Sequence, residues 1–167
     1  MGMDIYGKEG DAYFRRNIWG WPQLGSYIVD TFPELTAPCK RWFTNEGDGL
    51  DKEQSLALSR AISEALADGK VDEYVKELDA KLDAIPDETC KYCNGMGIRT
   101  DEVGRREKMP QKVVDDPKSP RHGQKGWCNG CNGRGMTTPY QKYGRLRVSN
   151  VEEFNAFLMI CGGFEIW

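Results

Sequence analysis

Four cysteines in two matched motifs are the residues of this sequence with the clearest chemistry. The pattern Cys-x-x-Cys-x-Gly-x-Gly occurs at residues 90–97 (CKYCNGMG) and again at residues 128–135 (CNGCNGRG). Each motif brings two thiolates onto one ion, so the pair supplies the four soft, tetrahedral ligands that structural zinc requires. The sequence therefore predicts one Zn²⁺ per chain, bound by Cys90, Cys93, Cys128 and Cys131. Redox use of the thiols and an iron–sulfur centre are the alternatives.

The other candidate residues are expected to be structural. Cys39 and Cys161 have no neighbouring cysteine in the sequence and are interpreted as buried core thiols. His122, the single histidine, lies in a loop-like stretch (SPRHGQKG) and is expected at the surface. A site of four thiolates leaves no open metal position, and the chain contains no zinc-protease, Walker or nucleophile-elbow motif. We therefore expect a protein without catalytic activity.

The repeated motif resembles the cysteine-rich zinc domain of the DnaJ (Hsp40) family. In that family four such repeats build two zinc sites, so two repeats here imply one site, over residues 90–135. The His-Pro-Asp tripeptide of the J domain is absent, since His122 is followed by Gly123. The resemblance thus implies zinc binding by the four cysteines and no co-chaperone activity.

A wider resemblance covers nearly the whole chain. The segments MGMDIYG, AYFRRNIWGWPQL, NEGDGLD, CKYCNGMGIRTDEVGR, GWCNGCNGRG and FLMICGGFEIW are similar to an uncharacterised family of phage- and prophage-associated proteins. The resemblance implies a phage-encoded protein and brings no known activity. The N-terminal stretch has no apolar core like that of a signal peptide, and no apolar run approaches the roughly 20 residues that span a bilayer. We expect a cytoplasmic protein, in the host cell if it is phage-encoded.

Charge is unevenly distributed along the chain. Residues 1–97 carry a net charge of −7, residues 98–147 carry +7 and residues 148–167 carry −3. An acidic part with a basic segment indicates two faces with different electrostatic preferences. We expect a non-catalytic protein that binds another protein with a basic surface, for example as an inhibitor of a host defence protein such as a CRISPR nuclease. A zinc-knuckle nucleic-acid-binding protein is the alternative, because the basic segment has aromatic neighbours.

Apolar spacing predicts four helices. The first has Pro22 in its first turn and covers PQLGSYIVDTF. The second begins after an Asp51 cap with Gln54 as its capping-box partner, and the third covers 71–84. The last begins near Ser149 or Asn150 and ends at Gly162. We expect the second and third helices to pair antiparallel. The stretch 143–149 (YGRLRVS) is expected to be a strand, and the final FEIW a short buried strand or tail.

These elements predict an α+β fold, a small helical body with a four-cysteine zinc-knuckle β-hairpin insertion and a C-terminal helix. Three segments follow: 1–88, the helical body with its aromatic N-terminal segment; 89–137, the zinc module with a long polar insertion; and 138–167, a strand and helix that pack on the body. The insertion is polar and rich in charge, so it is expected to be a mobile loop, above all over 115–125. Val113 and Val114 form its only apolar pair.

Overall fold

Two units make up the structure, a computed structural model that describes residues 2–167. The first, here called the core unit, consists of Met1–Leu82 and Tyr143–Trp167, and the second, the cysteine unit, consists of Asp83–Lys142. The predicted zinc segment 89–137 lies inside the cysteine unit. Helices and antiparallel strands occur together, so the predicted α+β class is confirmed.

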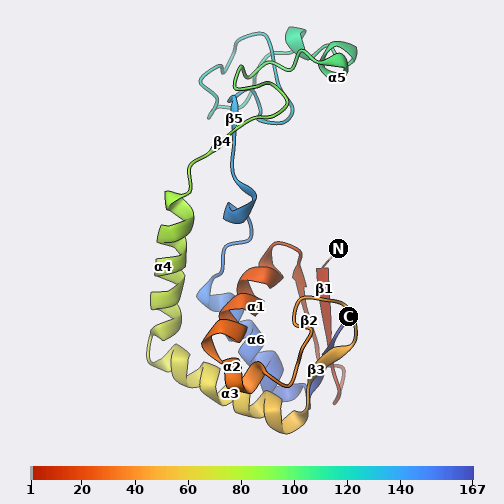
Figure 1. Ribbon diagram of the computed structural model, residues 1–167, viewed down its shortest axis with the longest axis vertical. Coiled ribbons are helices and arrows are strands. Elements are labelled where there is room, and N and C mark those ends of the chain that lie inside the picture. Colours follow the sequence, from red (N-terminus) through yellow and green to blue (C-terminus); the bar gives the residue numbers. More distant parts are fainter. Residues whose placement is uncertain (1) are drawn as a thin grey trace. The chain divides into compact units, whose positions relative to one another are not determined.

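An antiparallel sheet in the order β2-β1-β6-β3 forms one layer of the core unit (Figure 1). Its strands are β1 (Gly2–Gly7), β2 (Tyr13–Asn17), β3 (Asp48–Leu50) and β6 (Phe164–Ile166). In β6 the side chains of Phe164 and Ile166 are buried and Glu165 between them is not, which is the two-residue period of a strand with one face on a core. The prediction of a buried strand in FEIW is therefore confirmed. The other strands of the sheet were not predicted.

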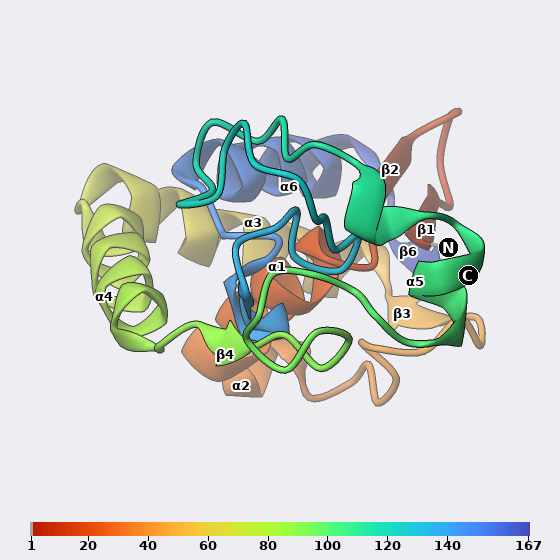
Figure 2. The same cartoon turned by 90° about the horizontal axis from the view of Figure 1, so that it is seen from above.

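The core unit also contains helices (Figures 1 and 2). They are α1 (Gly20–Thr31), α2 (Pro33–Thr36), α3 (Lys52–Ala67), α4 (Lys70–Ala84) and α6 (Val148–Ile160). The start of α3 is fixed by the predicted capping box: the Asp51 carboxylate accepts from the Gln54 backbone N–H at 2.8 Å, and the Gln54 side chain accepts from the Asp51 N–H at 3.0 Å. The predicted helices over residues 22–32, 51–69 and 71–84 are thus confirmed.

The predicted antiparallel pairing of α3 with α4 is wrong. Instead α3 packs along α6, where Asn155 bonds to Ser59 and Ser63, each at 2.8 Å. Figure 1 shows α4 leaving the end of α3 at a steep angle, and Figure 2 shows α4 end-on while α3 lies across the view. In the sequence, α3 and α4 each have one apolar and one charged face, so apolar spacing alone does not show which helix packs against α3.

An aromatic core lies between the helices and the sheet of the core unit. Trp21 and Trp42 stack with ring centroids 6.2 Å apart, and Phe154 and Phe164 approach edge-on at 6.3 Å. The buried indole nitrogens are satisfied, because Trp21 Nε1 donates to the Trp42 carbonyl at 2.6 Å and Trp42 Nε1 donates to the Thr36 carbonyl at 3.2 Å. The core unit therefore has a hydrophobic core of its own.

The stretch 143–149 is not a strand, which corrects the prediction. Gly144 takes a left-handed φ of 71°, which interrupts the extended backbone that a strand needs. The helix α6 then begins at Val148, because the Asn150 side chain accepts from the Arg147 backbone N–H at 3.1 Å. Asn150 therefore lies within the first turn of α6 rather than in the cap position.

The cysteine unit contains little regular structure. Its strands β4 (Glu88–Thr89) and β5 (Met136–Thr137) pair antiparallel, directly before the first motif and directly after the second. Its helical segments are α5 (Glu102–Arg106), η1 (Met109–Gln111) and η2 (Tyr140–Lys142). Since β4 and β5 lie next to the two motifs, they bring both motifs to one end of a strand pair, as the predicted hairpin insertion requires.

Candidate metal centre

Four thiols from the two motifs form one buried cluster. The Sγ atoms of Cys90 and Cys128 are 3.9 Å apart, and those of Cys93 and Cys131 are 3.7 Å apart. All four sulfurs lie within 4.8 Å of one another. Each cysteine is at most 2% exposed. The structure thus brings together all four residues that the sequence predicts as metal ligands.

The two motifs have matching backbone geometry. In each, the second cysteine donates its N–H to the carbonyl of the first at 3.3 Å, which closes the Cys-x-x-Cys turn. Asn94 and Asn132, the residues after those turns, take left-handed φ values of 50° and 51°. The last glycine of each motif then donates to a sulfur: Gly97 N–H to Cys93 Sγ at 3.3 Å, and Gly135 N–H to Cys131 Sγ at 3.2 Å. Such donors stabilise a thiolate.

Glycines allow the two motifs to pack against each other. A Cβ added to Gly97 would lie 2.4 Å from the carbonyl oxygen of Gly133, and one added to Gly135 would lie 2.3 Å from that of Gly95. The contacts are reciprocal, with the last glycine of each Cys-x-x-Cys-x-Gly-x-Gly pattern against the first glycine of the other. The glycines therefore hold the two halves of the cluster at their observed separation, as well as shaping each turn.

Burial and hydrogen bonding shift the pKa values of the thiols in different directions. Burial raises the pKa of the Cys128 thiol to about 12 and also raises the pKa of Cys93. At Cys90 burial acts in the same direction, but hydrogen bonds, led by the one from the Tyr92 backbone, outweigh it and lower the pKa. Without a cation, then, Cys93 and Cys128 hold their protons at neutral pH, and a metal must displace them.

A buried arginine links the two motifs. Arg99, only 8% exposed, donates from Nε and Nη2 to the Asp101 carboxylate and from Nη1 to Asn129 Oδ1 at 2.9 Å. Its guanidinium also lies 4.6 Å from the ring centroid of Tyr92. Because Tyr92 lies in the first motif and Asn129 in the second, Arg99 contacts both. The sequence does not predict this role, since nothing in the local pattern distinguishes Arg99 from the other basic residues nearby.

The separation of the sulfurs fits a tetrahedral metal ion. Four thiolates about 2.3 Å from a central ion have neighbouring sulfurs about 3.8 Å apart, from the geometry of a tetrahedron. The pairs Cys90–Cys128 and Cys93–Cys131, at 3.9 and 3.7 Å, match that separation, and all the other sulfur pairs lie within 4.8 Å. The donor set is sulfur only and buried, which is typical of a structural metal site.

The insertion between the motifs differs from the predicted mobile loop. Val114 is fully buried and contacts Gly133 of the second motif. Its N–H donates to the Gln124 carbonyl at 2.9 Å, and its carbonyl accepts from the Gly123 N–H at 2.8 Å. Val114 thus anchors the polar segment to the cysteine cluster, whereas Val113 is exposed.

Further contacts tie the insertion to the rest of the cysteine unit. Asp101 caps α5 by accepting from the Gly104 N–H at 2.8 Å, and Met109 is buried and accepts from the Trp127 N–H at 3.0 Å. The Asp116 carboxylate pairs with Arg134 of the second motif at 3.4 Å. A segment with few apolar residues is held here by backbone hydrogen bonds and charge pairs, which composition does not reveal.

The remaining candidates lie where the sequence predicts them. Cys39 and Cys161 are buried in the core unit, away from the cluster in the sequence and among apolar side chains. Burial raises the pKa of the Cys39 thiol to about 11 and also raises that of Cys161. His122 is exposed. None of the three belongs to the group of side chains close enough to hold a metal within residues 2–167.

Comparisons with protein-family models, with curated proteins and with solved structures found no match to this chain. Among the described residues, none of the helices is both long enough and apolar enough to cross a membrane. Functional inference therefore rests on the geometry of the site and on the surface around it.

Proposed function

We propose that this chain is a non-catalytic, zinc-stabilised binding protein. The observation that carries the proposal is the closed cluster of four buried thiols with sulfur pairs at 3.7 and 3.9 Å. Zinc is the ion that this donor set and geometry suit best, because four soft sulfurs in a tetrahedron are its usual structural site. Such a site has no open position for substrate or water, so its role is to hold the cysteine unit in shape.

Exposed apolar side chains around the cluster support a protein-binding role. Met96 and Met136, which are 56% and 39% exposed, lie next to the contact between Gly95 and Gly135. Tyr92 in the first motif is also exposed. Methionine side chains adapt their shape to a partner, and aromatic side chains are enriched in protein interfaces. We infer that zinc fixes this surface and that a partner protein covers it.

The charge of the core unit indicates the kind of partner. Outside residues 83–142 the chain carries 12 Lys and Arg and 18 Asp and Glu. A net negative unit of this kind favours a partner with a basic surface and raises the association rate at low salt. The chain would then be a phage-encoded inhibitor, and its partner a host defence protein such as a CRISPR nuclease, whose channels are basic.

One observation favours the second candidate, nucleic-acid binding. Residues 83–142 carry 11 Lys and Arg and eight Asp and Glu. The Lys91 Nζ also lies 5.4 Å from the centroid of the exposed Tyr92 ring. Basic residues beside an exposed aromatic ring form a stacking platform for single-stranded nucleic acid. Against this, the Arg99 guanidinium already lies over the Tyr92 ring at 4.6 Å.

Binding to bare nucleic acid separates the two candidates. The zinc-loaded chain is titrated into labelled single-stranded DNA, duplex DNA and RNA at physiological salt. We expect no sub-micromolar binding; tight binding that weakens steeply as salt rises would establish the alternative.

A capture experiment then tests the protein-binding surface. The chain, its chelated form and Met96→Glu are compared as bait against host extract. Gln111→Glu is the matched control, because Gln111 is exposed and the substitution adds the same single negative charge. We expect one partner that binds the zinc-loaded chain and Gln111→Glu, and that binds neither the chelated form nor Met96→Glu. Equal capture by all four baits would contradict the proposal.

A further inference from the structure

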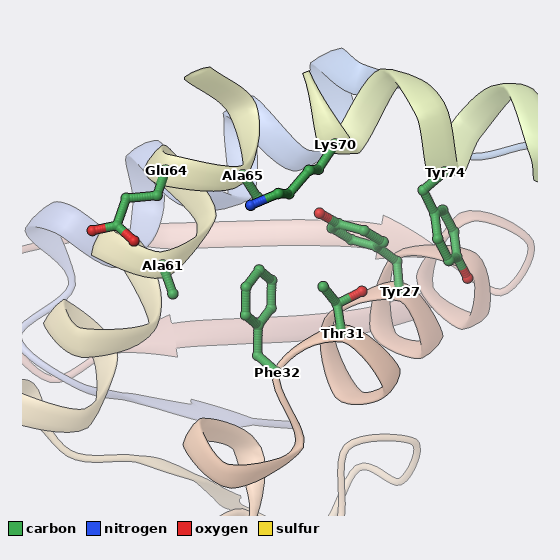
Figure 3. Close-up of a pocket in the computed structure, with 8 residues that line it drawn as sticks. All are labelled: Tyr27, Thr31, Phe32, Ala61, Glu64, Ala65, Lys70 and Tyr74. Carbon is green, nitrogen blue, oxygen red and sulfur yellow. The ribbon is translucent and has the colours of Figure 1, made fainter. Parts of the chain in front are cut away.

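A pocket of about 350 Å³ opens in the core unit between α1, α3 and α4 (Figure 3). Its size lies within the range of about 300–1,000 Å³ that is typical of ligand sites. The lining residues are Tyr27, Thr31, Phe32, Ala61, Glu64, Ala65, Lys70 and Tyr74. None of them takes part in the metal centre, so the pocket is a separate feature.

Aromatic rings form much of the pocket wall. Tyr27 meets Phe32 at an interplanar angle of 86° with centroids 6.2 Å apart, and it meets Tyr74 at 61° with centroids 4.8 Å apart. Rings set at steep angles present both faces and edges to the space between them. The ring faces carry negative electrostatic potential, so a pocket wall made of aromatic rings attracts a cation.

A buried hydroxyl in the pocket has no protein partner. Tyr27 is 1% exposed, and its hydroxyl oxygen has no hydrogen bond to the described protein atoms. Figure 3 shows this hydroxyl pointing toward the end of the Lys70 side chain. Burial raises the pKa of Tyr27 to about 12, so the group is neutral at physiological pH and can accept a hydrogen bond from a ligand.

The pocket lining contains one acidic and one basic side chain, Glu64 and Lys70. Lys70 is the one cation among the described lining residues, and its Nζ pairs with Asp68 at 2.8 Å. The pKa of Lys70 is raised first by that hydrogen bond, and in smaller part by Glu64 and Glu73. Asp30 acts electrostatically on Tyr74, whose pKa is raised chiefly by burial. The charged lining residues are thus Glu64 and Lys70, and Lys70 is already paired with Asp68, which disfavours an anionic ligand.

We propose that this pocket binds an arginine side chain of a partner protein. The inference rests on the proposed binding function, and it adds the chemistry by which a basic partner is recognised. A guanidinium stacks on the aromatic walls and donates an N–H to the Tyr27 hydroxyl, in a lining that includes Glu64 and whose lysine is already paired with Asp68. Its planar group uses the ring faces and the orphaned hydroxyl together, which a lysine ammonium does less well.

The test uses the full chain and a small probe, Nα-acetyl-L-arginine amide, followed by NMR of the aromatic and amide signals. We expect saturable shifts at Tyr27, Phe32 and Tyr74. Tyr27→Phe, which removes an unpartnered hydroxyl and so preserves the fold, is expected to weaken binding about tenfold, the effect of losing a hydrogen bond to a charged group. The neutral isostere Nα-acetyl-citrulline amide is expected not to bind.

Charge variants distinguish a cationic ligand from other occupants. Glu64→Gln is expected to weaken arginine binding several-fold, Lys70→Met to strengthen it, and the exposed Glu152→Gln on α6 to leave it unchanged. Loss of binding in Lys70→Met, tighter binding of an anionic probe or of Nα-acetyl-lysine amide, or no saturable binding would each overturn the proposal. Since the probe needs no partner protein, a failure here is separate from a failure of the capture experiment.

Discussion

At the scale of single residues, the four thiols differ from the other two cysteines in what surrounds them. Among the described residues, Cys39 is buried with apolar side chains and lies outside the group close enough to hold a metal, whereas Cys128 lies 3.9 Å from Cys90. Only the second arrangement can share one ion, because a metal needs several ligand atoms around the same point. The difference can be tested by substitution.

Cys128→Ser is expected to lose zinc and to destabilise the cysteine unit together. Zinc binding to a structural site supplies about 10–16 kcal/mol that is partly folding free energy, and losing one ligand removes a large share of it. Cys39→Ala is the matched control: it is expected to lower the stability of the core unit and to leave the zinc content unchanged. Elemental analysis and thermal unfolding measure the two effects, and loss of zinc in Cys39→Ala would show that the ligands are assigned wrongly.

Zinc affinity is expected to rise with pH across the neutral range. The raised pKa values of Cys93 and Cys128 keep both thiols protonated near pH 7, and zinc binds the thiolate forms. Protons therefore compete with the metal at low pH and compete less as pH rises. Calorimetry in buffers of different ionisation enthalpy measures the protons released. We expect at least two per zinc; a binding enthalpy that does not depend on the buffer would contradict this.

At the scale of elements, each motif is a turn whose last glycine contacts both a sulfur and the other motif. Gly97→Ala places a Cβ 2.4 Å from the Gly133 carbonyl oxygen and keeps the strained left-handed φ. Gly123→Ala is the matched control, because Gly123 has a similar φ of 77° and open space around it. The control is expected to cost only the backbone strain, about 1–2 kcal/mol.

Gly97→Ala is expected to cost clearly more than Gly123→Ala and to weaken zinc binding as well, because the Gly97 N–H donates to Cys93 Sγ. Chemical unfolding and competition with a chelator measure the two effects. Equal unfolding free energies for the two variants would mean that the contact between the motifs carries no stability.

The insertion between the motifs is expected to depend on the metal for its protection. Val114 is buried against Gly133, so the segment 115–125 is anchored to the cysteine cluster as well as held by its own backbone hydrogen bonds. Limited proteolysis should spare this segment in the zinc-loaded chain and cleave it after chelation. Rapid cleavage there while zinc stays bound would favour the mobile loop that composition alone suggests.

The sequence predicts some of these elements and misses others for physical reasons. Local spacing predicts two features: the paired cysteines predict the metal-binding group, and Asp51 with Gln54 predicts the start of α3. The sheet was missed because its strands are short and far apart in the chain, with β6 pairing with β1 and β3. Pairing of that kind depends on contacts that no local window contains. For the same reason the sequence does not predict the role of Arg99, because its contacts with Tyr92 and Asn129 depend on the fold.

At the scale of the whole molecule, the two units are stabilised differently. The core unit has a large aromatic and aliphatic core. In the cysteine unit, all of which the structure describes, the buried cluster consists of the four cysteines, and Met109 and Val114 are buried outside it. A small unit without a sufficient hydrophobic core needs a metal or disulfides to fold. The two units should therefore respond differently to removal of the metal.

Chelation is expected to unfold residues 83–142 and to leave the core unit folded. Amide hydrogen exchange resolves this, because protection should be lost across the cysteine unit and kept in α3, α6 and the sheet. The buried indoles of Trp21 and Trp42 give a second readout that should not change. Loss of protection throughout the chain would mean that the core unit is not stable by itself.

The most direct test of the account is X-ray absorption at the zinc edge of the purified chain, together with its metal content. The account predicts one zinc per chain with four sulfur neighbours at about 2.3 Å and no nitrogen or oxygen neighbour. A chain that holds no zinc, a visible iron–sulfur absorption band, or a mixed shell with an oxygen ligand would contradict it. The last result would also favour a catalytic role, because an oxygen ligand marks an exchangeable position on the metal.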